Sequence, residues 1–133
     1  MMTAKQFQVY QDNAVNTASG PQLTMMLYNG CIKFIKQAMI NMEENNYENK
    51  NINIQKAQNI ISELMITLDP NVEISKEFLS LYDFIHYQLT EANIKNEVSY
   101  LETALEFVID FRDMWKNIMK QEAHGKQTEE VRV

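Results

Sequence analysis

The chain has 133 residues and a formal net charge of −6, with 12 lysines and arginines against 18 aspartates and glutamates. This length fits one domain whose core needs no covalent staple. No basic stripe is present, which argues against nucleic-acid binding and against direct binding to an anionic membrane surface. The single cysteine excludes an internal disulfide and, within an apolar helical pattern, is typical of a small buried residue.

No apolar run approaches the roughly 18 residues of a membrane span, and residues 1–15 lack the pattern of a secretory signal. We therefore expect a cytoplasmic protein. Glycine and proline are rare, at three and two residues, and the long stretches between them favour helices over a strand-rich fold. Residues 1–18 carry scattered apolar side chains without a firm cap, which predicts a short mobile leader or helix.

The first long helix is predicted to begin at Ser19, which forms a capping box with Gln22, and Pro21 fits its first turn. It is predicted to end at the polar break over residues 43–46. Its main apolar stripe is joined by further apolar residues on other faces. This helix is therefore apolar around more of its circumference than one buried stripe requires.

The second helix is predicted over residues 47–68, where Asp69-Pro70 ends it because proline cannot continue a helix. The third is predicted over residues 76–95, with Ser75 as its cap. The apolar residues of both helices repeat in steps of three and four. In the second helix they are Ile54, Ala57, Ile61, Leu64 and Leu68, and in the third Phe78, Tyr82, Ile85, Leu89 and Ala92.

The fourth helix is predicted from about Glu97 to Gln121 and carries two adjacent apolar stripes. Residues 122–133 form a polar tail that we expect to be disordered. Four helices with short connections predict an all-α, antiparallel four-helix bundle over residues 19–121. The first and fourth helices carry more apolar residues than the about three core positions per heptad that a bundle needs. We expect the leader, a second subunit in a homodimer, or a partner to cover that surplus.

The reactive residues form no catalytic or metal-binding pattern. Asp83 and His86 are spaced i, i+3, but a di-iron bundle needs Glu-x-x-His on two helices and two further carboxylates. A histidine phosphotransfer domain is also an acidic four-helix bundle, yet its lysine and glycine at three and four residues after the histidine are replaced here by Leu89 and Thr90. We therefore expect no enzyme, no metal site and no cofactor.

Several motifs follow one another in order along about residues 7–120. The sequence reads YQDNAVNTAS over residues 10–19 and LTMMLYNG over residues 23–30, which fits the pattern L-x-x-M-L-Y-[DN]-G. Later helices carry KAQNIISEL at 56–64, LYDF at 81–84, LTEAN at 89–93 and FRDMW at 111–115. Together these motifs resemble the FliS family of flagellin export chaperones. One departure is that Gly20 separates Ser19 from Pro21, whereas the family usually places proline directly after the cap.

The resemblance implies a four-helix bundle whose ligand is the C-terminal segment of flagellin, disordered in the monomer. The chaperone would wrap this segment around its surface, prevent premature polymerisation and present it to the cytoplasmic domain of an export-gate membrane protein. No cofactor or nucleotide is implied. A different helical module that binds another amphipathic helix stays open as an alternative.

The candidate contact residues are apolar. Several lie off the main stripes, where core packing alone does not explain an apolar residue, and some are methionines, whose side chains adapt to irregular partners. The candidates are Tyr10, Met26, Tyr28, Ile32, Ile35, Met39, Phe107, Met114 and Ile118. Tyr28 fits a buried aromatic equally well. Phe7, Tyr10 and Val15 make the leader a candidate lid over a binding groove. The expected core residues are Leu23, Phe34, Ile61, Leu64, Ile85 and Leu105, with Gly30 at a close helix approach.

Overall fold

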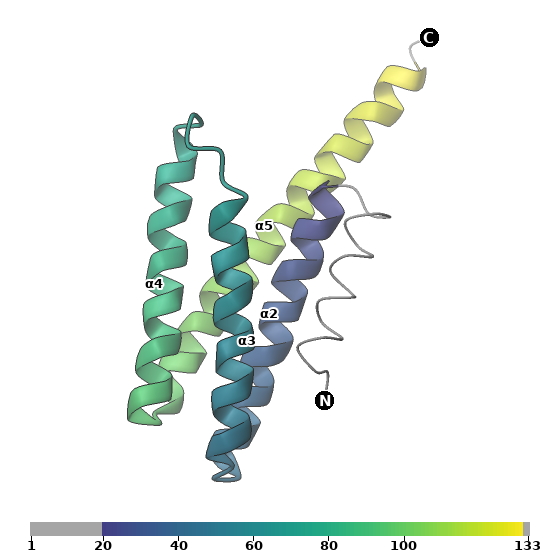
Figure 1. Cartoon of the computed structure of the whole chain (residues 1–133). Helices are drawn as coiled ribbons and strands as arrows, with labels where there is room; N and C mark the ends of the chain where they lie inside the picture. The colour runs from purple at the N-terminus through teal and green to yellow at the C-terminus, as the bar shows by residue number, and fades with distance from the viewer. Residues whose placement is uncertain (1–19, 132–133) are drawn as a thin grey trace.

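The computed structural model describes the backbone of residues 20–131 and the side chains of residues 20–121. This part of the chain forms four α-helices and no strand (Figure 1). The helices are α2 (Gly20–Glu43), α3 (Tyr47–Ile66), α4 (Ile74–Lys95) and α5 (Val98–Val131). The prediction of an all-α antiparallel bundle is confirmed. Residues of the predicted leader, and Ser19 of the predicted capping box, lie outside the described residues.

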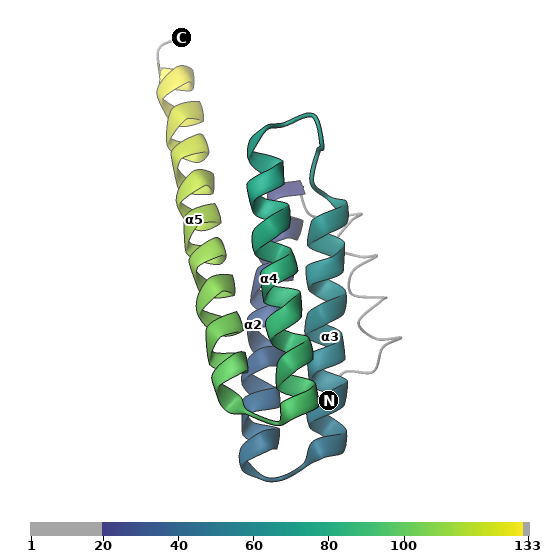
Figure 2. The ribbon, with the colours of Figure 1, turned by 90° about the vertical axis from the view of Figure 1, so that its left-hand side faces the viewer.

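The helices form a ring in which each packs against two neighbours. Helix α2 packs against α3 and α5, and α4 packs against the same two helices, whereas α2 and α4 lie diagonally across the core, where the Tyr28 and Tyr82 hydroxyls meet. Figures 1 and 2 show α2 and α4 at opposite corners of the bundle. The outer faces of α2 and α4 therefore point in different directions. A partner that contacts both faces has to bend around the bundle.

Asparagines end two of the helices, because their short polar side chain tolerates a left-handed backbone. Asn45 follows α2 with a φ of 57°, and Asn96 follows α4 with a φ of 53°. The Asn96 amide closes α4 by donating to the Ala92 carbonyl at 3.0 Å. The side chain of Asn46 caps α3 by accepting from the Asn49 amide at 3.2 Å. The polar break predicted over residues 43–46 is confirmed, and so is the boundary predicted between the third and fourth helices near residue 96.

Other helix ends differ from the prediction. Helix α4 begins at Ile74, so Ser75 is a buried residue inside the helix, and Glu73 at the N-cap position makes no side-chain capping bond. Helix α3 ends at Ile66 rather than Leu68. Helix α5 continues to Val131, past the expected end at Gln121 and into the segment predicted to be disordered. Six of the ten residues from 122 to 131 are glutamate, alanine, lysine or glutamine, which have high helix propensity.

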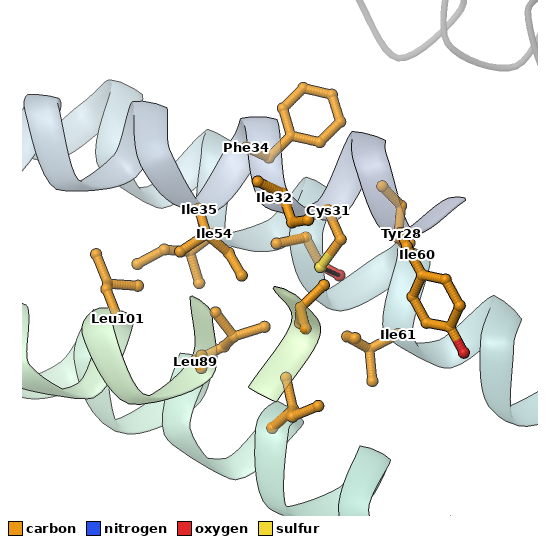
Figure 3. Close-up of a cluster of buried hydrophobic side chains, with 14 of the residues drawn as sticks. Tyr28, Cys31, Ile32, Phe34, Ile35, Ile54, Ile60, Ile61, Leu89 and Leu101 are labelled. Atoms are coloured by element: carbon orange, nitrogen blue, oxygen red, sulfur yellow. Dashed lines mark hydrogen bonds between the residues drawn. The ribbon is translucent and has the colours of Figure 1, made fainter. Parts of the chain in front are cut away.

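The core lies between the four helices, and Figure 3 shows apolar side chains converging there from α2, α3, α4 and α5. Of the expected core residues, Leu23 and Leu105 are only half-buried. The other four are buried: Phe34, Ile61, Leu64 and Ile85. A Cβ atom added at Gly30 would stand 3.3 Å from Ile60 Cδ1. The missing side chain therefore allows the close approach of α2 to α3 that the sequence predicts.

Candidate functional site: apolar partner-binding surfaces

A groove runs between the C-terminal half of α2 and the start of α5, and we call it the α2–α5 groove. It arises because the α2–α3 turn extends beyond the α4–α5 turn, which leaves the last turns of α2 without a full neighbour (Figures 1 and 2). Its volume is about 750 Å³. The groove is lined by Lys36, Met39, Ile40, Met42, Glu43, Asn96, Val98 and Leu105.

Apolar side chains dominate this lining and remain open to solvent. Ile40 is 52% exposed and Val98 is 41% exposed, although both are residues that normally favour burial. Met39, Met42 and Leu105 are partly buried and pack against the core. Thioether side chains repack easily around irregular shapes, so two methionines in the groove suit a ligand whose contour varies along its length.

A second apolar surface lies on α4, and we call it the α4 face. Phe84, Tyr87 and Ile94 are spaced so that they share one side of the helix, and Ile94 is 69% exposed. The Phe84 ring meets the Phe107 ring edge to face, with 5.1 Å between the centroids. Because Phe107 belongs to α5, the α4 face continues onto that helix. The two apolar surfaces therefore lie on either side of α5.

A buried lysine fixes one wall of the α2–α5 groove. The Lys50 ammonium donates to the Asn93 carbonyl oxygen at 3.1 Å and to Asn96 Oδ1, and it lies 5.4 Å from the centre of the Tyr47 ring. Burial lowers the pKa of Lys50. The carbonyl ends of α4 carry partial negative charge, which favours a cation there. Lys50 thus anchors the α4–α5 turn, whose Asn96 and Val98 line the groove.

The other end of the bundle is closed by an aromatic cluster. The hydroxyls of Tyr28 and Tyr82 lie 2.6 Å apart and share a buried hydrogen bond. The Phe111 ring lies 5.9 Å from the Tyr28 ring and 4.9 Å from the Tyr82 ring. Burial raises the pKa of both tyrosines. The indole of Trp115 donates to the Pro21 carbonyl at 2.9 Å, which joins α5 to the start of α2.

The described residues do not bring catalytic or metal-binding side chains together in a cluster. That part of the chain holds no cluster of three or more His, Cys, Asp or Glu side chains suited to a metal ion. Asp83 is exposed and His86 is half-buried. Cys31 is fully buried, and burial raises the pKa of its thiol to about 12, so a reactive thiolate is disfavoured. Among the helices described, none is long and apolar enough to cross a membrane.

Comparison with known proteins identifies the family. The sequence profile of the family described as "Flagellar protein FliS" matches residues 2–122. The chain belongs to the FliS family. It is 47% identical over 116 residues to the flagellar secretion chaperone FliS of Bacillus subtilis (strain 168), an alignment that covers 87% of each chain. It is 32% identical over 123 residues to FliS of Escherichia coli (strain K12), with 87% of this chain and 90% of the relative covered.

The fold of this FliS-family chain also matches a solved structure, described as a flagellar chaperone from bacteria. The TM-score is 0.72 at 19% sequence identity, and the match covers 88% of this chain and 97% of the other. At that identity the likeness concerns the fold alone. The four-helix architecture of the FliS-family chain is thus shared with a flagellar chaperone whose sequence has diverged widely.

The structure places the predicted contact residues in several environments. Tyr28, Ile32 and Ile35 are buried in the core of the FliS-family chain, so we leave them out of the binding surface. Met39 lines the α2–α5 groove, and Phe107 lies beneath Phe84 at the edge of the α4 face. The predicted residues outside the described part are Phe7, Tyr10 and Val15.

The remaining predicted residues are half-buried and are not brought to the groove. Met26 lies near the start of α2, and Met114 and Ile118 lie in the second half of α5. Because α2 and α5 are antiparallel and Trp115 meets Pro21, these three residues lie toward the opposite end of the helix pair from Met39. Sequence reasoning missed Ile40, Val98, Tyr87 and Ile94. A signal was available for Ile40, Tyr87 and Ile94, since each is a large apolar residue outside its helix's main stripe. Val98 instead continues the stripe of Leu101 and Leu105 and has the spacing of a core position.

Proposed function

We propose that this chain is a flagellar export chaperone that binds the C-terminal segment of flagellin. The observation that carries the proposal is the presence of two separate apolar surfaces on one bundle, in the α2–α5 groove and on the α4 face. Contiguous exposed apolar surface of this kind usually marks a protein interaction site. Membership of a family whose relatives are named flagellar secretion chaperones supports the choice of cargo.

The separation of the two surfaces favours a flexible ligand over a rigid one. A single straight helix lying in the α2–α5 groove covers the outer face of α2 and leaves the α4 face exposed, because α2 and α4 are not neighbours. A segment that is disordered when free can pass around α5 and fold against both surfaces in turn. Amphipathic helices in such a ligand would place one apolar edge against each surface.

The proposal extends to the cellular role of the complex. While bound, the segment cannot form the helical contacts of the filament, so polymerisation is blocked until release. The chaperone with its cargo then meets the cytoplasmic domain of an export-gate membrane protein, which places the chain in the cytoplasm. No step of this cycle requires a metal, a nucleotide or a catalytic residue.

Residues 1–18 are proposed as a lid, because Phe7, Tyr10 and Val15 give this segment apolar side chains that suit a groove. Deletion of residues 1–18 is then expected to increase binding of an apolar dye such as ANS to the free protein. A far-UV spectrum that retains the helical signal of the full chain controls for unfolding. Unchanged dye binding by a folded deletion variant would remove the lid from the account.

The proposal is tested by mixing the chain with the flagellin of its host and measuring the mass of the complex by size exclusion with light scattering. Full-length flagellin is expected to form a 1:1 complex, and flagellin lacking its last ~40 residues, the length that the family resemblance implies for the segment that folds on binding, is expected to form none. Ile40→Glu should weaken the complex, whereas Asn51→Glu, at an exposed polar position of α3, should not. Equal binding of both flagellins, or a chaperone dimer that takes no cargo, contradicts the proposal.

A further inference from the structure

A small polar cavity adjoins the α2–α5 groove on the α3 side of α2, and we call it the amide notch. Its volume is about 270 Å³, and it is lined by Gln37, Ile40, Asn41, Asn49 and Asn53. Ile40 lines both the notch and the groove, so the two hollows lie side by side along α2. Four side-chain amides in one cavity, with no acid or base among the lining residues, differ sharply from the apolar groove next to it.

The notch contains a buried polar group that the fold does not satisfy. Asn53 is 2% exposed, and its Nδ2 donates to Asn41 Oδ1 at 2.7 Å. Its Oδ1 is buried and has no hydrogen-bond partner among the described residues. Buried side-chain oxygens are nearly always paired with protein groups or ordered water, so Asn53 Oδ1 needs a partner that the described residues do not supply, either water or a ligand.

The Asn41–Asn53 pair accepts either kind of polar ligand atom. Reversing both amides makes Asn41 the donor and leaves Asn53 Nδ2, instead of Oδ1, as the unpaired atom. In each arrangement one polar atom of the Asn53 amide is left without a hydrogen-bond partner among the described residues. A ligand that offers both a donor and an acceptor therefore fits the notch without regard to which arrangement is present.

The lining also selects against charge. A carboxylate, ammonium or guanidinium entering the notch would lose water without meeting an opposite charge, because the lining residues are neutral. A side-chain carboxamide has the required donor and acceptor and carries no charge. At about 30 Å³ for each water in the liquid, the notch has room for such a side chain.

We propose that the amide notch binds the carboxamide of one Asn or Gln side chain in the segment that occupies the α2–α5 groove. This inference rests on the proposed function, since it names a feature of that same cargo. Apolar side chains of the segment can shift along the apolar groove, because such contacts are not directional. A single carboxamide in the notch, in contrast, fixes the register of the segment along α2. The notch thereby contributes specificity more than contact area.

The inference is tested by calorimetric titration with a peptide of the last ~40 residues of the host flagellin. Asn49→Ala is expected to weaken binding by about five- to tenfold, the effect of losing a typical hydrogen bond. Asn51→Ala, at an exposed asparagine of the same helix outside the notch, should bind like the unaltered chain. Asn53→Ala should also weaken binding, and because that residue is buried, Asn49→Ala decides the outcome if Asn53→Ala does not fold.

A double-mutant cycle shows whether the contact is direct. Each Asn and Gln of the peptide is replaced by Ala in turn, and one replacement should weaken binding to the unaltered chain but have no further effect on Asn49→Ala. Binding that Ile40→Glu abolishes and both notch variants leave unchanged would mean that the notch holds only water, which overturns the inference and leaves the proposed function standing. No binding by the unaltered chain would overturn both.

Discussion

Replacing Tyr82 by phenylalanine removes one partner of the buried hydroxyl pair and tests whether the aromatic cluster stabilises the bundle. The Tyr28 and Tyr82 hydroxyls lie 2.6 Å apart, and both residues are 2% exposed. In Tyr82→Phe the Tyr28 hydroxyl is left buried without that partner, which costs about 1–3 kcal/mol of unfolding free energy. For a chain of this size, that loss corresponds to a decrease in Tm of about 4–12 °C.

The double variant separates the hydrogen bond from general packing. Tyr28→Phe together with Tyr82→Phe removes both hydroxyls, leaves no unpaired oxygen, and should be less destabilising than Tyr82→Phe alone. Urea unfolding followed by far-UV circular dichroism, with the fluorescence of the single Trp115 as a second probe, gives the free energies. Tyr87→Phe, at an exposed position, is the matched control. The reasoning is refuted if Tyr82→Phe is as stable as the control, or if the double variant loses the full sum of the two single losses.

Three further predictions concern other buried groups. Lys50→Met should lower the unfolding free energy by about 2–3 kcal/mol in urea titrations, because two partly buried oxygens lose a charged donor. Lys36→Met, at an exposed position, is its control, and equal stability of the two variants would contradict this role. The raised pKa values of Tyr28 and Tyr82 favour their protonated forms in the folded state, so their contribution is complete below about pH 10 and decreases as the pH rises above it. The urea midpoint should therefore fall more between pH 8 and pH 11 for the unaltered chain than for the double phenylalanine variant, and parallel curves would count against this. The buried thiol of Cys31, whose pKa is raised to about 12, should react with a disulfide reagent such as DTNB only after urea is added; rapid reaction of the native chain would disprove its burial.

The bundle itself could be predicted from the sequence because local signals agree along its helices. Apolar residues recur in steps of three and four, and the asparagine-rich breaks mark two of the turns. The boundaries were less accurate, since Ser75 is a suitable cap residue that tertiary packing buries inside α4. The continuation of α5 past Gln121 reflects helix propensity in a segment that composition alone suggested to be disordered.

The proposed binding surface follows only in part from the sequence, because it depends on where helix ends lie in space. The α2–α5 groove exists because the α4–α5 turn stops short of the α2–α3 turn, and no single helix encodes that offset. Met39, which was predicted because it lies off the main stripe of its helix, lines that groove. Tyr28 fitted a contact residue and a buried aromatic equally well in sequence, and the structure buries it; its hydrogen-bond partner, Tyr82, is 54 positions away, so no local pattern shows the pair.

Polar residues of the interior were the hardest to predict. Lysine and asparagine are usually exposed, so nothing in the local pattern distinguishes Lys50 or Asn53 from their solvated neighbours. Lys50 is buried because the end of α4 supplies oxygen acceptors, and Asn53 because Asn41 faces it across the α2–α3 contact. Both environments come from other helices and become visible only once the bundle is assembled.

The central claim, that the exposed apolar surface is a site for flagellin, is tested most directly by the heat capacity of binding. The full chain is titrated at several temperatures with a peptide of the last ~40 residues of the host flagellin. The account predicts saturable binding near 1:1 with a negative heat-capacity change, of the size expected when a disordered segment buries roughly 1,000–3,000 Å² of surface. Absence of binding by the full chain, and also by the chain lacking residues 1–18, would leave the bundle intact and contradict the assignment of its cargo.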